Sequence, residues 1–468
     1  MTVTIQSAVQ RLEAGETTAV ELTRNALANA DAFDAQLGVY MRRDDATALA
    51  AAEASDVARA AGEPMGPLAG IPVGIKDIIT TREGPTTCQS LVFDSSSMSG
   101  DATVVERLRA AGAVIVGKTT TMEFAIGTPD PEKPFPIPRN PWRPDTWTGG
   151  SSSGTGGGVA SEMMLAGLGT DTGGSIRIPA ANCGITGLKA TFGRVPKDGC
   201  APLGFSLDHI GPMTRSAYDA ALMLNVMAGH GPLDPSSSSE PVVDYTAGLT
   251  GDLRGVTVGI DTLERVYTDA AARAELTEAF GELKARLTEA GARVVPVQLP
   301  HYTQVATASM MLMIVEAAAY HSADLRDRWH DYSRGLRECL SMATLYSSAD
   351  VVQAQRIRRV GVQAAHDLLR TVDVIATPTT TGGALTFAEV ERMWDGPGDT
   401  NLTGYWNGLG NPTLALPFGF TADGLPLSVS LTAAAFDETA ALRVGHAFQG
   451  ATDYHLQRAP MLTASMAA

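Results

Sequence analysis

Cysteine is scarce in this chain of 468 residues, and the motifs that usually mark disulfide frameworks and metal centres are missing. The four cysteines lie far apart in the sequence, at Cys88, Cys183, Cys200 and Cys339. No CxxC or HExxH motif occurs, and the eight histidines form no cluster with the spacing of metal ligands. The sequence therefore predicts reduced thiols, no disulfide framework and no metal site.

Positive charge and long apolar runs are also in short supply. Lysine and arginine number 35 against 51 aspartate and glutamate residues, which gives a formal net charge of −16. Such an acidic chain is poorly suited to nucleic acid or an anionic membrane. Its apolar runs are shorter than the ~20 residues of a membrane helix, and residues 1–22 lack the basic start and apolar core of a signal peptide. We therefore expect a cytoplasmic protein with no nucleic-acid partner and no membrane association.

Segments with helical spacing alternate with short apolar segments along the chain. Residues 1–60 predict a helical N-terminal segment, and a helix over 102–111 leads into a strand at 113–116. Strands at 256–260 and 293–299 enclose a helix that ends at Gly291, as in a βαβ unit. Further helices are expected near 155–166, within 305–345, over 351–371 and near the C-terminus, and further strands at 372–378, 413–420 and 425–431. The alternation predicts an α/β fold with one large mixed sheet.

Two glycine-framed serines, Ser151 and Ser175, lie 24 residues apart within residues 147–180. Glycine lets the backbone approach a ligand and adopt positive φ, and successive N–H groups can then line a concavity that suits an oxyanion. The pattern predicts two catalytic serines beside a cradle of donors. Upstream, Lys76 ends the apolar run at 70–75, where a low dielectric favours a neutral amine that can act as a base. Asp171 and Arg177 flank the second serine, and we expect them to form an ion pair that holds its loop.

Three other patterns match parts of these segments. Residues 112–119 match the phosphate-loop pattern GxxxxGK[ST], but the apolar residues 113–116 indicate a strand, which cannot wrap a phosphate. Residues 150–154 match GxSxG, which would make Ser152 the nucleophile of a Ser-His-Asp esterase, with Asp373 and His446 among the downstream acids and histidines. The segment before Ser152 is broken by prolines, unlike the strand that a nucleophile elbow requires. A flexible linker at 149–158 fits poorly, because an apolar helix and a second glycine-framed serine follow directly.

The chain resembles the amidase signature family at PLAGIPVGIKDI (67–78), GTDTGGSIRIPA (169–180), CGITGLKATFGRV (183–195) and LDHIGPMTRS (207–216). The likeness continues more weakly to the C-terminus through VDVIATPTT, NGLGNPTLALPFGF and GLPLSVSL, so that it covers nearly the whole chain. It implies a central twisted sheet covered on both faces by helices, in a single domain over 1–468.

The resemblance also implies roles for individual residues. Ser175 resembles the nucleophile, Ser151 the serine that precedes or carries a cis peptide, and Lys76 the general base. No cofactor is implied. The family usually reads GGSSGG, and here Ser153 stands in place of the first glycine after the serine pair. The implied oxyanion hole consists of the backbone amides of Thr172, Gly173, Gly174 and Ser175.

These residues predict an amidohydrolase that cleaves a small neutral amide, with carbamates and hydrazides as chemical relatives, through an acyl-enzyme on Ser175. We expect a small-molecule substrate, and a homodimer is one expected assembly. The main alternative is the glutaminase subunit of a tRNA-dependent amidotransferase. That subunit usually has glutamine where Ile178 stands, and an aspartate that holds the glutamine amino group where Thr400 stands, with Asp399 one residue away.

The segment 309–316 is rich in methionine and is expected to be core rather than substrate pocket. His321, Trp329 and His330 follow in the same predicted helix, with no role assigned to them. The substrate-binding residues are not predicted by the sequence.

Overall fold

The computed structural model describes residues 2–392 and 401–464. Its first 60 residues form three helices and one short strand: α1 (Ile5–Glu13), α2 (Ala19–Leu37), β1 (Tyr40–Arg43) and α3 (Asp45–Ala60). Thr4 and Thr18 cap α1 and α2 by accepting a hydrogen bond from the third helical N–H. The segment predicted to be helical thus also supplies a strand to the sheet.

A single 11-stranded sheet runs through the molecule in the order β1-β3-β2-β6-β8-β7-β12-β13-β11-β9-β10. Strands β2, β3 and β6 are parallel, as are β9, β10 and β11, whereas the strands between them pair antiparallel. The prediction of an α/β fold with one large mixed sheet is therefore confirmed. The strands are β2 (Pro72–Lys76), β3 (Val114–Thr119), β6 (Ala166–Asp171), β7 (Thr186–Lys189), β8 (His209–Thr214), β9 (Thr257–Ile260), β10 (Arg293–Pro296), β11 (Val374–Pro378), β12 (Thr413–Phe420) and β13 (Pro426–Ala433).

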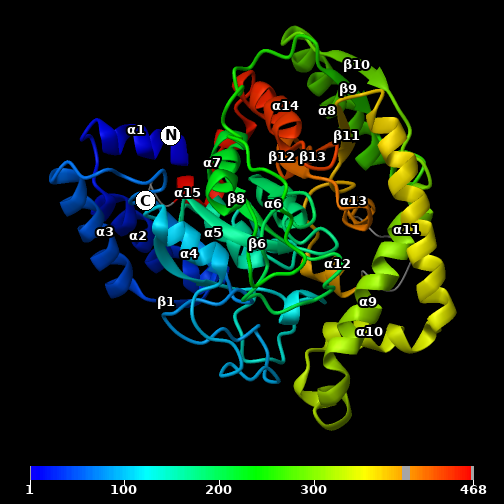
Figure 1. Ribbon diagram of the computed structural model, residues 1–468, viewed down its shortest axis with the longest axis horizontal. Helices are drawn as coiled ribbons and strands as arrows, with labels where there is room; N and C mark the ends of the chain where they lie inside the picture. The colour runs from blue at the N-terminus through cyan, green and yellow to red at the C-terminus, as the bar shows by residue number, and fades with distance from the viewer. Residues whose placement is uncertain (1, 393–400, 465–468) are drawn as a thin grey trace.

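Helices cover both faces of this sheet, and the alternation of side chains along each strand explains why. In β12, Leu414 and Leu416 pack in the same core as Leu442 of α14, whereas Ala415 packs with Ala180 of α6. Helices α5 and α6 therefore share one face, and α7 and α14 lie on the other (Figure 1). Their bounds are α5 (Ser153–Ala160), α6 (Arg177–Cys183), α7 (Ala217–Met227) and α14 (Glu438–Gly450).

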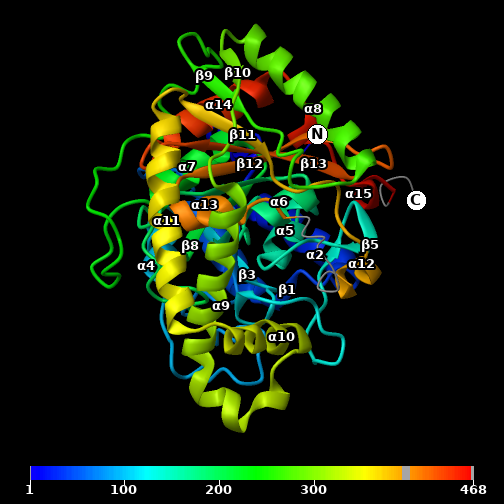
Figure 2. The ribbon, with the colours of Figure 1, turned by 90° about the vertical axis from the view of Figure 1, so that its right-hand side faces the viewer.

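The second half of the chain adds the predicted βαβ unit, in which α8 (Ala270–Glu289) joins the parallel strands β9 and β10. Two long helices, α9 (Tyr302–Asp327) and α11 (Ser348–Leu369), lie side by side along one edge of the molecule (Figures 1 and 2). The remaining helices are α4 (Thr103–Ala110), α10 (Arg334–Met342), α12 (Phe387–Glu391), α13 (Gly404–Leu409), α15 (Pro460–Ala464) and the short 3-10 helices Glu123–Ala125, Trp329–Asp331, Ala343–Leu345 and Tyr454–Leu456.

Several predicted boundaries need correction: the strand expected at 293–299 ends at Pro296, and the helical segment expected at 305–345 is interrupted after Asp327. The helix expected near 155–166 ends at Ala160, because Glu162 takes a φ of 58° and Ser161 donates its hydroxyl to the Gly157 carbonyl at 2.7 Å. The strand expected at 113–116 extends as β3 to Thr119. The phosphate-loop match at 112–119 therefore lies mostly in a buried strand, which cannot wrap a phosphate.

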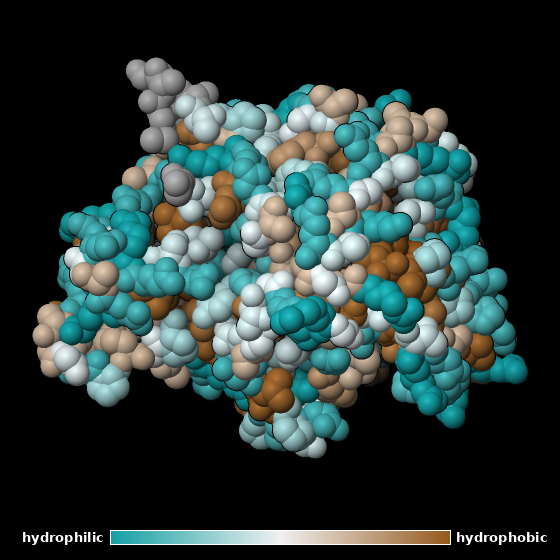
Figure 3. Space-filling model, turned by 90° about the horizontal axis from the view of Figure 1, so that it is seen from above, coloured by the Kyte–Doolittle hydropathy of each residue, from teal (hydrophilic) through white to brown (hydrophobic). Residues whose placement is uncertain are grey.

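The start of the described chain contacts its C-terminal region, since Thr2 Oγ1 donates to the Leu456 carbonyl at 2.8 Å. On the face shown in Figure 3, polar residues predominate and apolar residues form several separate patches. Within residues 2–392 and 401–464, no helix is long and apolar enough to cross a membrane, and no three His, Cys, Asp or Glu side chains are placed to hold a metal ion.

Candidate active site

Lys76 ends strand β2 with its side chain fully buried. Its Nζ lies 2.7 Å from Ser151 Oγ and 2.7 Å from Thr170 Oγ1. Both partners are hydroxyls, and Lys76 forms no ion pair within the described part of the chain. Burial lowers the pKa of Lys76 to about 7, because the charged amine loses its hydration without gaining an ion-pair partner, and the more distant Asp171 and Asp208 offset only part of that loss. The neutral and protonated amines are therefore both accessible near neutral pH.

Ser151 lies in the loop between β5 (Arg143–Trp147) and α5, and the Gly150–Ser151 peptide bond is cis. The Ser151 carbonyl accepts a hydrogen bond from the Met122 N–H at 3.2 Å. Ser153, which stands where the family usually has glycine, donates its buried hydroxyl to the Gly149 carbonyl at 2.7 Å. The departure from the family pattern thus adds a hydrogen bond that closes the loop on itself.

Ser152 is fully buried, and its hydroxyl is engaged with the backbone of Thr170. Ser152 Oγ accepts from the Thr170 N–H at 3.1 Å and donates to the Thr170 carbonyl at 3.2 Å, while the Ser152 N–H donates to the Ser175 carbonyl at 3.2 Å. These bonds tie the serine loop to β6 and to the Ser175 loop. They leave the Ser152 hydroxyl poorly placed to attack a substrate.

The acid and the histidine considered for an esterase lie elsewhere. Asp373 accepts a hydrogen bond from the Thr257 N–H at the start of β9, and His446 on α14 faces the ring of Tyr218. The structure therefore does not assemble a Ser-His-Asp arrangement around Ser152 from these residues.

Ser175 follows β6 in the loop 172–175, which leads into α6. The Ile176 and Arg177 N–H groups donate to the Asp171 carboxylate at 3.2 and 3.4 Å. No hydrogen bond among residues 2–392 and 401–464 uses the N–H groups of residues 172–175, and none joins the Ser151 and Ser175 hydroxyls. The loop is thus held by its carbonyl groups and by the residues that follow it. The N–H groups of residues 172–175 have no hydrogen-bond partner within the described residues.

The predicted ion pair between Asp171 and Arg177 is present, with Arg177 Nε 2.9 Å from Asp171 Oδ2 and both side chains fully buried. Asn407 completes the network: its Nδ2 donates to Asp171 Oδ1 at 2.7 Å, and its Oδ1 accepts from Arg177 Nη2 at 2.6 Å. Burial alone would raise the pKa of the Asp171 carboxyl, but the Arg177 guanidinium outweighs it and holds that pKa below its usual range. The loop that bears Ser175 is therefore fastened to α13 by a satisfied charge pair.

Thr403, which the sequence analysis missed, lies directly beneath this loop. Its hydroxyl donates to the Gly173 carbonyl at 2.5 Å, and its own carbonyl accepts from Arg177 Nη1 at 3.1 Å. Gly174 has a φ of 135°, and a Cβ there would collide with Thr403 Oγ1. Because a trans peptide directs its C=O and N–H to opposite sides, the bond to Thr403 turns the Gly174 N–H away from α13. The only sequence signal near Thr403 is the family-like segment that begins at Asn407.

The methionine-rich segment contributes one side chain to these surroundings. Met313 is buried and packs beside Gly173, whereas Met310 is 38 % exposed. His321 is also buried, with Nδ1 3.1 Å from the Tyr332 hydroxyl, and burial lowers its pKa to about 4. Trp329 and His330 form a short surface 3-10 helix, and the structure brings neither of them to the serines. Asp399 and Thr400 lie outside the described residues.

A family model described as Amidase matches residues 21–442. The chain belongs to the amidase signature family. A glutamyl-tRNA(Gln) amidotransferase subunit from Chloroflexus aggregans is 38 % identical over 97 % of both chains. A putative amidase, AmiD, from Mycobacterium bovis is 36 % identical over 95 % of this chain and 93 % of its own. The peptide amidase of Stenotrophomonas maltophilia superimposes with a TM-score of 0.83 at 29 % identity, covering 98 % of each chain.

Membership makes this protein an enzyme that acts on carbon–nitrogen bonds. The family includes both amidases and amidotransferase subunits among these relatives, at similar identity. The comparisons therefore show the class of bond on which this enzyme acts, and these relatives do not share one substrate.

Proposed function

We propose that this amidase family member is an amidohydrolase that cleaves a small neutral amide, carbamate or hydrazide through an acyl-enzyme on Ser175. The main support for this proposal is the contact between Lys76 Nζ and Ser151 Oγ, which lie 2.7 Å apart. The contact is buried, and burial lowers the pKa of Lys76 to about 7. A lysine in these surroundings has the protonation equilibrium that a general base needs near neutral pH.

The proposed reaction begins with neutral Lys76, which accepts the Ser151 hydroxyl proton as Ser151 accepts that of Ser175. The Ser175 oxygen forms a bond to the substrate carbonyl carbon, and the carbonyl oxygen becomes an oxyanion. The amides of residues 172–175 face this charge, and their unpaired state in the described structure supports that role. The C–N bond then breaks as the nitrogen takes the proton back from Ser151, and protonated Lys76 restores it. Water enters by the same relay, and the acid leaves.

The molecule's organisation supports the same proposal. The site is assembled from β2, β6, the loops before α5 and α6, and the start of α13, all attached to one sheet. We propose that a single domain carries the activity without a cofactor, and that the enzyme works in the cytoplasm.

A second candidate is the glutaminase subunit of a tRNA-dependent amidotransferase, which the 38 % identity to a protein of that name favours. Ile178 speaks for the free amidase, because its apolar side chain packs against Gly149 and Gly174 where that subunit usually has a polar glutamine. The purified chain should then hydrolyse a neutral aryl or alkyl amide faster than glutamine and need no partner. Glutaminase activity that arises only after other subunits are added, with no action on neutral amides, would reverse this ranking.

The nucleophile is tested by a pair of serine variants. Ser175→Ala should abolish turnover and prevent labelling by a fluorophosphonate, since both require the attacking oxygen. Ser152→Ala should retain labelling and substantial turnover, because Ser152 only fastens the loop. If the Ser175→Ala variant were labelled and active and the Ser152→Ala variant inert, Ser152 would be the nucleophile instead.

A further inference from the structure

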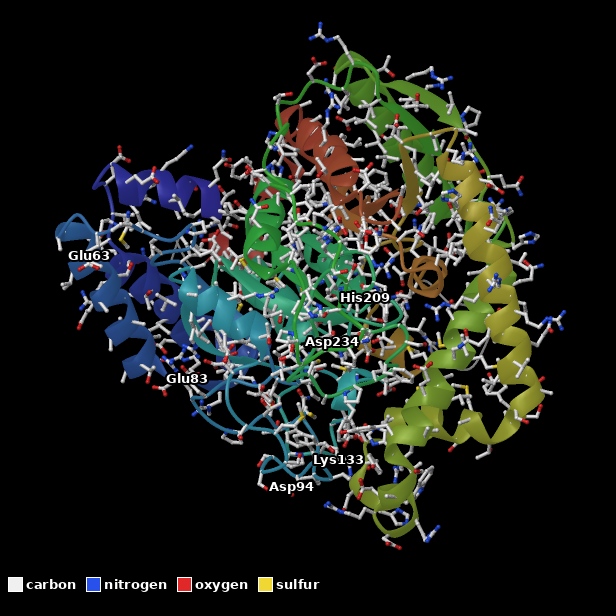
Figure 4. The ribbon with its side chains drawn as sticks, viewed as in Figure 1. Glu63, Glu83, Asp94, Lys133, His209 and Asp234 are labelled. Atoms are coloured by element: carbon white, nitrogen blue, oxygen red, sulfur yellow. The ribbon has the colours of Figure 1, made fainter. Side chains whose placement is uncertain are left out.

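A cavity of about 200 Å³ opens beside the catalytic lysine. Thr170 and Thr172 contribute to its wall, and the Thr170 hydroxyl is the one that lies 2.7 Å from Lys76 Nζ. The other walls come from the loops 197–205 and 233–235 and from the start of β8. Figure 4 labels two lining residues, His209 and Asp234, near the middle of the molecule, whereas the labelled Glu63, Glu83, Asp94 and Lys133 lie toward its edges.

The inner wall of this cavity is apolar. Ile78, Ala201, Leu203 and Ile210 line it, and each is at most 3 % exposed. Ala125 closes the side nearest the 3-10 helix Glu123–Ala125. Apolar walls of this kind favour the transfer of an apolar group from water.

The carboxylate that contacts the Ser175 loop, Asp208, is already satisfied by the protein. Asp208 accepts hydrogen bonds from Thr172 Oγ1 at 2.6 Å, the Leu203 N–H at 3.1 Å and the Gly204 N–H at 3.0 Å. These bonds hold the loop 203–208 against the loop that bears Ser175. Asp208 is therefore a structural group rather than a free acceptor for a ligand.

Most of the other ionisable side chains of the cavity are engaged in the same way. Asp198 Oδ2 accepts from the Thr103 N–H and hydroxyl at 3.2 and 2.8 Å, whereas its buried Oδ1 has no hydrogen-bond partner within the described residues. Asp234 accepts from the Lys197 and Ser236 N–H groups at 3.0 and 2.8 Å. Lys197 Nζ donates to the Phe205 carbonyl and lies 4.5 Å from the centre of the Phe192 ring. Burial holds the pKa of His209 well below its ordinary value, which keeps that ring neutral. Apart from the Asp198 Oδ1 atom, a zwitterion such as glutamine would have to displace these internal bonds to pair its charges, at a high desolvation cost.

Two large apolar side chains stand exposed at the rim. Phe205 is 66 % exposed and Leu233 is 75 % exposed, and they come from different loops. A substrate group that enters the cavity would cover both of them, which adds to its binding.

We propose that this cavity is the subsite for an uncharged apolar group of the substrate, an aromatic ring or a short branched alkyl chain. An apolar cavity of roughly 150 Å³ suffices for benzene, so about 200 Å³ accommodates a ring with a small substituent. The inference rests on the proposed amidohydrolase activity and narrows its substrates to amides that carry such a group, such as simple anilides.

The test compares kcat/KM for a simple anilide with kcat/KM for a small aliphatic amide, and uses the ratio of the two. The wild-type ratio should exceed ten. Ala201→Leu, which adds volume inside the cavity, should lower the ratio at least tenfold, mainly through KM for the anilide. The double variant Phe205→Ala/Leu233→Ala, at the exposed rim, should lower it about threefold without disturbing the core. Leu345→Ala is the matched control, because Leu345 is 78 % exposed and does not line the cavity; its ratio should stay that of the wild type.

The outcomes separate the subsite from the activity itself. An unchanged ratio in both the Ala201→Leu and the rim variants would overturn the subsite, and so would a wild-type ratio near one. In either case, Ser175-dependent hydrolysis of the small amide would leave the amidohydrolase proposal standing. Absence of any Ser175-dependent amide hydrolysis would instead defeat the proposed function. Should Ala201→Leu fail to fold, the rim variant alone decides.

Discussion

Lys76 and Lys118 stand on neighbouring parallel strands, both buried and both preceded by an apolar run, yet their surroundings differ. Lys76 Nζ contacts two hydroxyls. Lys118 Nζ lies 3.1 Å from the Asp77 carboxylate and also donates to the Ile79 carbonyl and the Thr86 hydroxyl. Burial lowers the pKa of both lysines, but within the described residues only Lys118 has a carboxylate at ion-pair distance to favour its charged form, since Asp171 and Asp208 act on Lys76 from farther away. The Asp77 carboxylate therefore favours the ammonium form of Lys118, whereas the amine of Lys76 can exchange a proton with its hydroxyl partner.

A shift in strand register produces this difference. Pro72 and Val73 pair with residues 114 and 115, but Gly74 pairs with Gly117, so that β3 carries an extra residue. Lys118 therefore lies level with Ile75, and Lys76 with Thr119. Since successive side chains point to opposite faces, the extra residue places the two lysines on opposite faces of the sheet.

A third buried lysine shows that a lowered pKa alone does not identify a base. Burial lowers the pKa of Lys189 to about 7 as well. Its Nζ donates to the Ala190 carbonyl at 3.3 Å and to the Asn411 carbonyl, and it lies 3.4 Å from His209 Nε2. The carbonyls have no proton to give, and the neutral His209 ring uses its N–H at Nδ1 for the Asp171 carbonyl at 3.1 Å, so that Nε2 only accepts. The partners of each amine, rather than its burial, therefore separate Lys76 from the other two.

The largest expected effect is the loss of activity in Lys76→Met. Removing the base should lower kcat by a factor on the order of 10² to 10⁴ for amides. The variant should fold as well as the wild type or better, because methionine fills the space without a buried amine to desolvate. Steady-state kinetics and thermal unfolding measure the two quantities. Near-normal turnover would remove Lys76 from the mechanism.

The same substitution on the neighbouring strand should have the opposite profile. Lys118→Met leaves the Asp77 carboxylate buried without its cation, which should cost about 3–5 kcal/mol of unfolding free energy. Denaturant unfolding measures that cost, and the folded fraction should keep its kcat. If Lys118→Met proved stable and inactive, the contrast between the two lysines would be wrong.

A smaller loss of activity is expected when the loop that bears Ser175 loses its contact with Thr403. Thr403→Val removes the hydroxyl that holds the Gly173 carbonyl, and it should lower kcat about tenfold with little change in KM, because the loop amides matter most when the oxyanion forms. Thr403→Ser should restore most of the rate.

Thr214→Val is the matched control for that substitution. Thr214 is a fully buried threonine whose hydroxyl also donates to a backbone carbonyl, that of Ser216 at 2.9 Å, at the far end of β8. Its kcat should be unchanged. Equal losses in the two valine variants, or no rescue by serine, would show a general packing effect rather than positioning of the loop.

The sequence predicts a good part of this architecture and site, but only where local patterns carry the information. Apolar strands, the βαβ unit and the motif residues Lys76, Ser151 and Ser175 are recognisable because each sits in a distinctive short segment. Thr403 lies 228 residues beyond Ser175, in a segment with no chemical motif, and only the packing of α13 brings it under the loop. The register shift that separates Lys76 from Lys118 depends on pairing between strands, which neither segment specifies alone.

The pH dependence of kcat/KM tests the central claim, that neutral Lys76 is the base, most directly. Because only the unprotonated amine accepts a proton, the wild-type rate should rise about tenfold per pH unit in acid and level off above a midpoint near the Lys76 pKa of about 7. Residual turnover of Lys76→Met, measured on an activated ester at high enzyme concentration, should lack this limb over the same range. A limb that survives in Lys76→Met with its midpoint unchanged would contradict the account and transfer the titration to another group, with Lys189 the first to examine.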